Sequence, residues 1–241
     1  LFGIIDLAGL PKDRYYLYRS HWNKVDHTLH ILPHWTWNGR EGETTPVFVY
    51  SDYPTVELFI NGVSQGKRTK NLSVKIDDTE NDASRKSLAR QKRYRHMWMD
   101  TKYEPGTLRA VAYDAQGKAC METEVHTAGK PYAIELVPEE NRSLKAGAED
   151  LAYITVRIVD KNGILCPDAQ HSVKFSVKGA GAYRAGANGD PTNLELFHLP
   201  KMKVFNGMMT AIVQEGGKAG KITLVASAKG LKSAKLEIEV E

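Results

Sequence analysis

The sequence contains little cysteine, no long apolar run and no marked excess of one charge. Its 241 residues include two cysteines, Cys120 and Cys166, which lie in different predicted domains, so a disulfide-stabilised scaffold is not indicated. No apolar run approaches the roughly 20 residues that a membrane-spanning helix needs, which excludes such a span within this sequence. The 33 basic and 29 acidic residues leave a formal net charge of +4, too small and too scattered to indicate nucleic acid as a partner.

The composition is that of a β-rich globular protein. Hydrophobic residues make up 41% and charged residues 26% of the chain, with 20 glycines and 10 prolines, and the length fits two small domains. The clearest hairpin lies at residues 56–68, where VELFI and VSQGKR flank Asn61 and Gly62. Asn-Gly is the preferred two-residue turn because both positions need positive φ. Further strands are predicted at residues 46–50 and in RYRHMWMD, LRAVAY and KACMETEVH, which is enough for one sandwich.

A second set of strands follows the Gly-Lys-Pro break at residues 129–131. Ile154, Val156 and Ile158 share one face of a predicted strand, the alternation expected of a half-buried strand in an antiparallel sandwich. The same alternation recurs along SVKFSV and LKSAKLEIEV. We therefore predict a domain boundary near residue 130, with a second sandwich beyond it that is built like the first.

The first residues of the sequence predict a helix rather than a strand. Pro11 suits a first helical position, and Asp13 in the opening turn favours the positive end of the helix dipole. Tyr15, Tyr18 and Trp22 then recur at spacings of three and four, which places an aromatic stripe on one helical face. We expect this stripe to cover a neighbouring strand or barrel.

Several segments resemble a known family. Residues 3–13 (GIIDLAGLPKD), followed by YY and SHW, resemble the end of the catalytic barrel in family 2 glycoside hydrolases of the β-galactosidase type, with Leu10 where the family usually carries phenylalanine. The segments HILPHWTW, GREG, VYS, VELFING and YEPGTL resemble the immunoglobulin-like domain that follows that barrel. The resemblance implies an all-β fold: a short helical remnant of a (β/α)8 barrel at residues 1–24, then immunoglobulin-like β-sandwiches at residues 25–130 and 131–241.

The resemblance places the chemistry of the family outside this sequence. Retaining glycosidases use two carboxylates about 5 Å apart, and in this family both glutamates lie at the ends of earlier barrel strands. No residue here is therefore expected to be catalytic, and no cofactor or metal is implied. The expected function is a non-catalytic C-terminal part that braces the barrel and can mediate assembly, inactive alone. The parent enzyme would hydrolyse terminal β-galactosides or related glycosides with retention.

The same resemblance sets the expected partners and context. The sequence begins at Leu1, without an initiator methionine or a signal segment, and we expect it to be a fragment. Its expected partners are its own upstream catalytic barrel, the carbohydrate substrate of the parent enzyme and a second copy in a homo-oligomer, with no nucleic acid. The residues alone leave the cellular compartment open, and the resemblance favours the periplasm or the cell exterior.

Three histidines have a spacing that zinc sites use. His27, His30 and His34 lie three and four residues apart, and zinc favours imidazole ligands. However, Pro33 interrupts any helix here, Ile31 and Leu32 alternate toward a strand, and no carboxylate or cysteine completes a ligand set. We predict no metal site and interpret these residues as ordinary linker and strand histidines.

Two tryptophans suggest sugar contact. Trp35 and Trp37 would share one face of a strand, and aromatic rings stack on sugars, although such a face is more often core. A carbohydrate-binding module is therefore one alternative function, and it predicts sugar affinity that either Trp-to-Ala change would abolish. A cell-surface adhesin or invasin-like immunoglobulin array is another. It would explain residues 131–241 but not the opening helix.

Two stretches depart from the strand pattern, and a function specific to this protein would lie in one of them. Residues 76–93 are charged and predict a solvated insertion, with a short helix over residues 83–91. Residues 185–207 contain several glycines and prolines around Leu194, Leu196 and Phe197, which predicts an ordered loop with an apolar anchor. We expect that loop to contact the barrel or a partner subunit.

Overall fold

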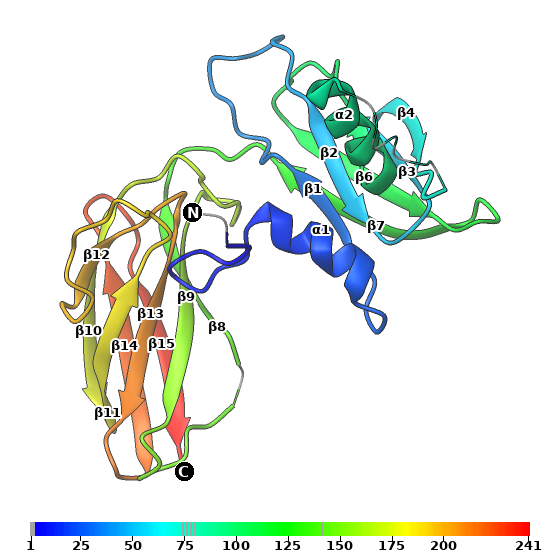
Figure 1. Cartoon of the computed structure of the whole chain (residues 1–241). Helices are drawn as coiled ribbons and strands as arrows, with labels where there is room; N and C mark the ends of the chain where they lie inside the picture. The colour runs from blue at the N-terminus through cyan, green and yellow to red at the C-terminus, as the bar shows by residue number, and fades with distance from the viewer. Residues whose placement is uncertain (1–2, 74, 76, 78, 80, 141) are drawn as a thin grey trace. The chain divides into compact units, whose positions relative to one another are not determined.

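The computed structural model describes residues 3–73, 75, 77, 79, 81–140 and 142–241 (Figure 1). It contains two compact units: the first unit is Pro11–Thr127, and the second unit combines Leu1–Leu10 with Ala128–Glu241. Strands dominate both units, and the described ranges contain two helices, so the predicted all-β fold is confirmed. Neither of these helices is long and apolar enough to cross a membrane.

The first unit is a sandwich of two antiparallel sheets. One sheet has the order β1-β2-β5 and the other β4-β3-β6-β7. Their strands are β1 (Leu29–Leu32), β2 (Val47–Ser51), β3 (Thr55–Ile60), β4 (Val63–Thr69), β5 (His96–Trp98), β6 (Thr107–Tyr113) and β7 (Ala119–His126). Both sheets contribute to one apolar core because their strands alternate: Val56, Leu58 and Ile60 of β3 are buried between half-exposed neighbours.

The predicted hairpin of the first unit is confirmed. Ile60 pairs with Val63 across the turn, and Asn61 and Gly62 adopt φ values of 48° and 83°, as a two-residue turn with positive φ requires. The Asn61 side chain also reaches the next part of the sheet. Its Oδ1 accepts from the backbone N–H of Thr107 at 2.8 Å, and its Nδ2 donates to the Pro105 carbonyl at 3.1 Å.

Helix α1 (Asp13–Trp22) confirms the predicted opening helix, but a different aromatic residue faces the sheet. Tyr16 stacks on His30 of β1, and the Nε2 atom of His30 lies 2.8 Å from an Asp13 carboxylate oxygen. Of the predicted stripe, Tyr18 and Trp22 instead stack on each other with centroids 4.6 Å apart, and Trp22 is 71% exposed.

Helix α2 (Ala83–Tyr94) lies in the predicted insertion and is three residues longer than expected. Asp82 caps it, since its side chain accepts from the N–H groups of Ser84 and Arg85. No residue of α2 is buried. Residues 76, 78 and 80, at the start of the same predicted insertion, lie outside the described residues.

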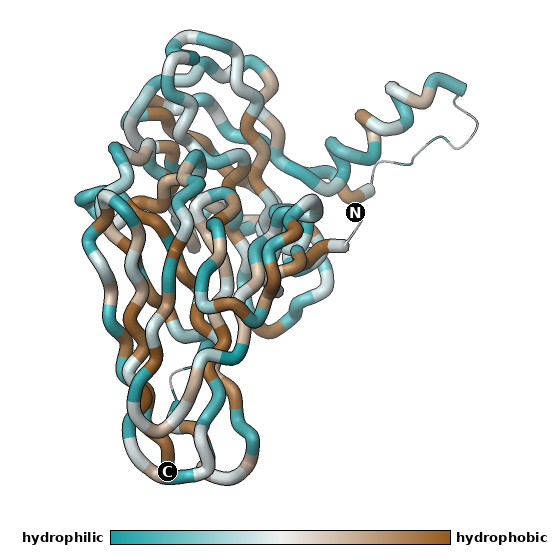
Figure 2. Tube along the Cα trace, turned by 90° about the vertical axis from the view of Figure 1, so that its left-hand side faces the viewer, coloured by the Kyte–Doolittle hydropathy of each residue, from teal (hydrophilic) through white to brown (hydrophobic). Residues whose placement is uncertain are grey.

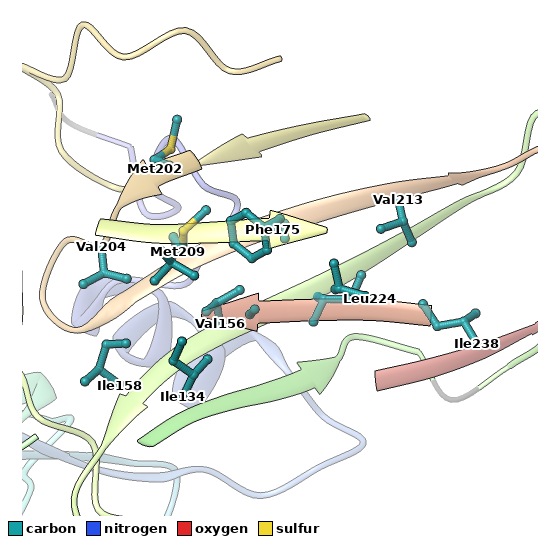
Figure 3. Packing of buried hydrophobic residues seen from close by; sticks show 14 of the residues in the cluster. Ile134, Val156, Ile158, Phe175, Met202, Val204, Met209, Val213, Leu224 and Ile238 are labelled. Atoms are coloured by element: carbon teal, nitrogen blue, oxygen red, sulfur yellow. The ribbon is translucent and has the colours of Figure 1, made fainter. Parts of the chain in front are cut away.

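The second unit is also a sandwich of two antiparallel sheets. Their orders are β11-β13-β9-β8 and β12-β10-β14-β15. The strands are β8 (Ala133–Pro138), β9 (Leu151–Val159), β10 (Ser172–Gly179), β11 (Gly181–Ala187), β12 (Lys201–Lys203), β13 (Met208–Glu215), β14 (Gly220–Ser227) and β15 (Ala234–Val240). Hydrophobic and hydrophilic residues alternate along these strands (Figure 2), and side chains from both sheets meet in one core (Figure 3). Ile154, Val156 and Ile158 lie in that core, as predicted.

The two units divide the opening residues between them. Residues 3–10 belong to the second unit, whereas α1 belongs to the first, and the second unit resumes at Ala128. The origin of residues 1–24 in a barrel stays a prediction. The two cysteines are free and lie in separate units. Burial raises the pKa of the Cys166 thiol to about 11, as expected for an unreactive core thiol.

Candidate functional site

The most unusual surface of the second unit is a loop with several uncovered apolar side chains. This apolar loop comprises residues 190–200, between β11 and β12. Four large side chains in it are exposed: Leu194 by 93%, Leu196 by 58%, Phe197 by 53% and Leu199 by 46%. Single exposed apolar residues are normal, but four within six positions form the kind of patch that marks an interaction surface.

Hydrogen bonds fix the base of the apolar loop. The Asn188 side chain is buried, and its Nδ2 donates to the Lys203 carbonyl at 2.7 Å, which ties the two ends of the loop together. Its Oδ1 accepts from the Asp190 N–H at 3.1 Å, and the Asp190 carboxylate in turn accepts from the Thr192 N–H at 2.8 Å. These hydrogen bonds between side chains and backbone take the place of the backbone hydrogen bonds between paired strands, so the loop is ordered.

The backbone of the loop is also bonded near its exposed side chains. The Phe197 carbonyl accepts from the N–H of Gly186 in β11 at 2.8 Å, and the N–H of Lys201 donates to the Leu199 carbonyl at 2.7 Å. The chain therefore cannot turn these side chains inward without breaking backbone hydrogen bonds. The sequence predicted Leu194, Leu196 and Phe197 as an apolar anchor, and the structure shows that they point to solvent.

A second exposed element lies at the base of this loop. The opening segment, residues 3–10, is held on the second unit by the Thr210 hydroxyl, which donates to the Ala8 carbonyl at 2.8 Å. The Asp6 carboxylate closes the segment into a turn by accepting from the N–H groups of Ala8 and Leu10, at 2.8 and 2.9 Å. It also lies against Gly189, where an added Cβ would be 2.2 Å from the Asp6 Oδ2 atom.

The opening segment extends the apolar character of this region. Ile5 is 39% exposed and Leu7 57% exposed, although the intervening Asp6 side chain is used to hold the turn. Because Asp6 contacts Gly189, which directly precedes the apolar loop, the opening segment and the loop meet there. We call the two together the apolar face.

The predicted sugar-contact residues lie in the first unit, in different surroundings. Trp35 is 0% exposed, donates from Nε1 to the Glu104 carbonyl at 2.9 Å and packs edge to face on Tyr103. No ligand can reach its ring there. Trp37 is partly exposed, with His34 stacked 4.2 Å from its centroid and the Arg40 guanidinium 5.1 Å away. Sugar contact at Trp37 stays a prediction.

The three histidines of the predicted linker do not converge. His27 pairs with Asp52 at 2.6 Å, and His30 with Asp13 at 2.8 Å. His34 instead stacks on Trp37. Each imidazole has its own neighbour within the first unit, and no group of three or more metal-ligating side chains occurs among the residues that the structure describes.

A buried polar cluster that sequence reasoning missed lies in the first unit. Lys70 is 8% exposed, and its Nζ donates to the Ser51 carbonyl. His96 is 1% exposed, with Nε2 3.1 Å from the Pro54 carbonyl oxygen. Burial lowers the pKa of Lys70 to about 8 and that of His96 to about 4. The only sequence signal would have been the position of these residues at strand ends, which does not reveal burial.

The chain is similar to known proteins along its whole length. Residues 134–237 match the family described as "Glycoside hydrolase family 2 C-terminal domain 5", and residues 42–121 match a "Domain of unknown function (DUF4982)". The chain is 40% identical over 240 residues to "Beta-galactosidase BoGH2A" of Bacteroides ovatus, covering 100% of this chain and 25% of that protein. It is 32% identical over 194 residues to a "Putative beta-glucuronidase" of Formosa agariphila, covering 78% of this chain and 16% of that protein.

Solved structures agree with the sequence comparisons. A beta-glycosidase from Bacteroides vulgatus superposes with a TM-score of 0.86 at 34% identity, covering 99% of this chain and 28% of that chain. A glycosyl hydrolase family 2 member from Bacteroides cellulosilyticus gives a TM-score of 0.82 at 27% identity, covering 99% of this chain and 31% of that chain. The chain thus spans a quarter or less of the length of the two curated relatives above.

Proposed function

This chain belongs to the C-terminal region of glycoside hydrolase family 2, and we propose that it is a non-catalytic part that supports the catalytic barrel of a longer enzyme. The apolar face of the second unit would be the surface that contacts the barrel. The observation that carries the proposal is the exposure of Leu194, Leu196, Phe197 and Leu199 on a loop whose backbone is fixed.

The energetics support a role in docking. Burying the exposed parts of these four side chains would contribute on the order of 5 kcal/mol at about 25 cal/mol per Å² of apolar area. That is comparable to the whole folding stability of many domains, so leaving the patch in water is costly. The opening segment supports the barrel as the partner because, in sequence, it resembles the end of the barrel in this family and lies on the same unit.

For the longer enzyme we propose hydrolysis of terminal β-glycosides with retention of configuration. The Bacteroides ovatus relative bears a β-galactosidase name, which favours a galactoside, and two relatives from Formosa agariphila bear putative β-glucuronidase names, which makes a glucuronide the alternative. Assay of the longer enzyme on a panel of chromogenic glycosides distinguishes the two. We expect turnover of the β-galactoside, and preference for the β-glucuronide would overturn that choice of sugar.

The docking role is tested in the same longer enzyme with the double variant Leu194→Ser/Phe197→Ser. We expect faster hydrogen exchange in the barrel segments that the apolar face covers and a melting temperature lower by several degrees. Val137→Ser is the matched control, because Val137 is 39% exposed on β8 of the same unit and lies outside the apolar face. Equal effects of the two variants on barrel exchange would contradict the proposal.

A further inference from the structure

A pocket of about 290 Å³ lies in the second unit, next to the base of the apolar loop. Three parts of the chain line it: residues 167–170 of the β9–β10 connection, residues 188–193 of the β11–β12 connection, and residues 203–206 at the end of β12 and in the turn to β13. We call this cavity the polar pocket. It belongs to a different unit from Trp35 and Trp37, the tryptophans for which sugar contact was predicted.

Hydrogen bonds join the three walls of the polar pocket. The Val204 N–H donates to the His171 carbonyl at 3.0 Å, and the Gly207 N–H donates to the Ala169 carbonyl at 3.2 Å. Both bonds connect the turn after β12 to the β9–β10 connection, and the Asn188 side chain ties the third wall to the end of β12. The walls are therefore fixed before any ligand arrives, so binding would cost little ordering of the chain.

Several side chains of the polar pocket have unused hydrogen-bonding groups. Asp168, Gln170 and Asn206 are exposed, and within the described part of the chain their side chains make no hydrogen bond or ion pair. Asn188 is 5% exposed, and its amide uses one N–H on Lys203 and one lone pair on the Asp190 N–H. A carboxamide has two of each, so one donor and one acceptor remain on a buried side chain that lines the pocket.

The polar pocket contains charges of both signs, which disfavours a simple ion as its ligand. Asp168 and Asp190 would repel an anion, and the Lys203 ammonium would repel a cation. The other polar side chains of the lining are carboxamides, among them Gln170 and Asn206, and a carboxamide both donates and accepts hydrogen bonds. This combination suits an uncharged ligand with several hydroxyl groups, because each hydroxyl also donates and accepts.

We propose that the polar pocket binds one uncharged sugar ring, an inference that rests on the pocket itself and not on the glycosidase function proposed above. Phe205, which is 37% exposed, lines the pocket together with Pro167 and Val204. These apolar groups offer a surface for the C–H face of a sugar, while the carboxamides and carboxylates take its hydroxyls. The volume lies at the lower end of the range for small-molecule sites, which fits a single ring.

The polar pocket and the docking role can be tested with separate variants. Asp190 and Asn193 belong both to the pocket and to the apolar loop. The exposed side chains on which the docking role depends, Leu194, Leu196, Phe197 and Leu199, do not line the pocket. A sugar bound there would contact the loop on its polar side, so sugar binding does not require the apolar face to be covered.

The test is a nuclear magnetic resonance titration of the 241-residue chain with methyl β-galactoside, methyl β-glucoside and methyl α-mannoside. We expect at least one of the three to shift the side-chain amide signals of Gln170, Asn188 and Asn206. The variant Asp168→Ala/Gln170→Ala should weaken binding at least fivefold, because it removes two groups that would bond the ligand. It should leave the fold intact, since these side chains hold nothing else in the described part of the chain.

Matched variants separate the pocket from the rest of the second unit. Glu139→Ala/Gln214→Ala also removes one carboxylate and one carboxamide, but outside the pocket, and should change affinity less than twofold. Phe205→Ala should weaken binding, and Phe205→Tyr, which keeps a ring, should restore it. The inference is overturned if none of the three sugars shifts these amide signals or if the control weakens binding equally. It is also overturned if inorganic phosphate or Ca²⁺ shifts the signals at lower concentration than the sugars do.

Discussion

Tyr16 of α1 lies flat on the imidazole of His30 in β1, with ring centroids 3.9 Å apart and planes inclined by 11°. This stacking, together with the bond between His30 and Asp13, selects which side of α1 faces the first sandwich. The other aromatic pair, Tyr18 and Trp22, stacks on itself, and Trp22 is left exposed. The orientation of the helix thus depends on a polar and aromatic contact rather than on an apolar stripe.

Replacing Tyr16 should release α1 from the sheet. Tyr16→Ala removes the stacked ring, and we expect the first unit to lose about 1 to 3 kcal/mol of stability in urea unfolding. Trp22→Ala is the comparison, because a side chain that is 71% exposed should cost less than about 0.5 kcal/mol. A larger loss from Trp22→Ala would show that the helix packs through its other side.

The stability of the first unit should fall in mild acid because of His96. Its folded pKa is about 4 against an ordinary value of 6.5, so the folded state favours the neutral ring. The free energy of unfolding should be unaffected by His96 above pH 6.5. It should fall by about 3 kcal/mol as the pH drops from 6.5 toward 4, because the unfolded state takes up the proton more readily. Urea unfolding between pH 7 and pH 4 should show this slope, and His96→Gln should flatten it.

Lys70 should modulate the same acid response. Its charge is one of the causes that lower the pKa of His96, after burial. Lys70→Met removes the charge, so the folded pKa of His96 should rise toward its ordinary value, and the stability lost between pH 6.5 and pH 4 should become smaller. Unfolding curves of this variant that matched those of the wild type across pH 7 to pH 4 would argue against coupling between the two side chains.

Gly189→Ala should displace the opening segment from the second unit. An alanine Cβ would lie 2.2 Å from the Asp6 Oδ2 atom and would push that carboxylate off the N–H groups of Ala8 and Leu10. Hydrogen exchange at those two amides should accelerate. In an Asp6→Ala background the clash is gone, because the Asp6 Cβ is 3.4 Å away, so adding Gly189→Ala should have little further effect. Additive effects would mean that the two residues act separately.

The two predicted sugar-contact tryptophans should behave differently. Trp35→Ala should destabilise the first unit by about 3 to 5 kcal/mol, because it removes a fully buried ring and leaves the Glu104 carbonyl without its donor. Trp37→Ala should be milder and is the variant that tests carbohydrate contact. If the intact chain bound no sugar on a glycan array of neutral sugars, the prediction of sugar contact at Trp37 would be wrong.

The structural features that the sequence predicted correctly are those determined by residues close to one another in the chain. The Asn61-Gly62 turn follows from its φ requirements, and the alternation of Ile154, Val156 and Ile158 follows from burial of one strand face. Both depend on neighbours within a few positions, so the pattern alone suffices. The entry into α1 was evident from Asp13 in its first turn, but the prediction for Pro11 was wrong, because Pro11 precedes the N-cap Lys12 instead of occupying the first helical position.

The remaining features depend on partners distant in sequence. Tyr16 faces inward because it stacks on His30. Lys70 is buried with its Nζ on the carbonyl of Ser51, 19 residues earlier, which no periodicity reveals. The exposure of Leu194 was likewise invisible, since an apolar loop residue is equally compatible with an anchor. Only the backbone bonds on either side of the loop decide that it points outward.

The second unit is assembled from two stretches of chain separated by the whole of the first. During synthesis Ala8 leaves the ribosome 202 residues before Thr210, the residue that holds it. Ala8, which is buried in the folded chain, must therefore stay uncovered while the whole of the first sandwich is made. A chaperone that binds nascent chains would find a target in this segment.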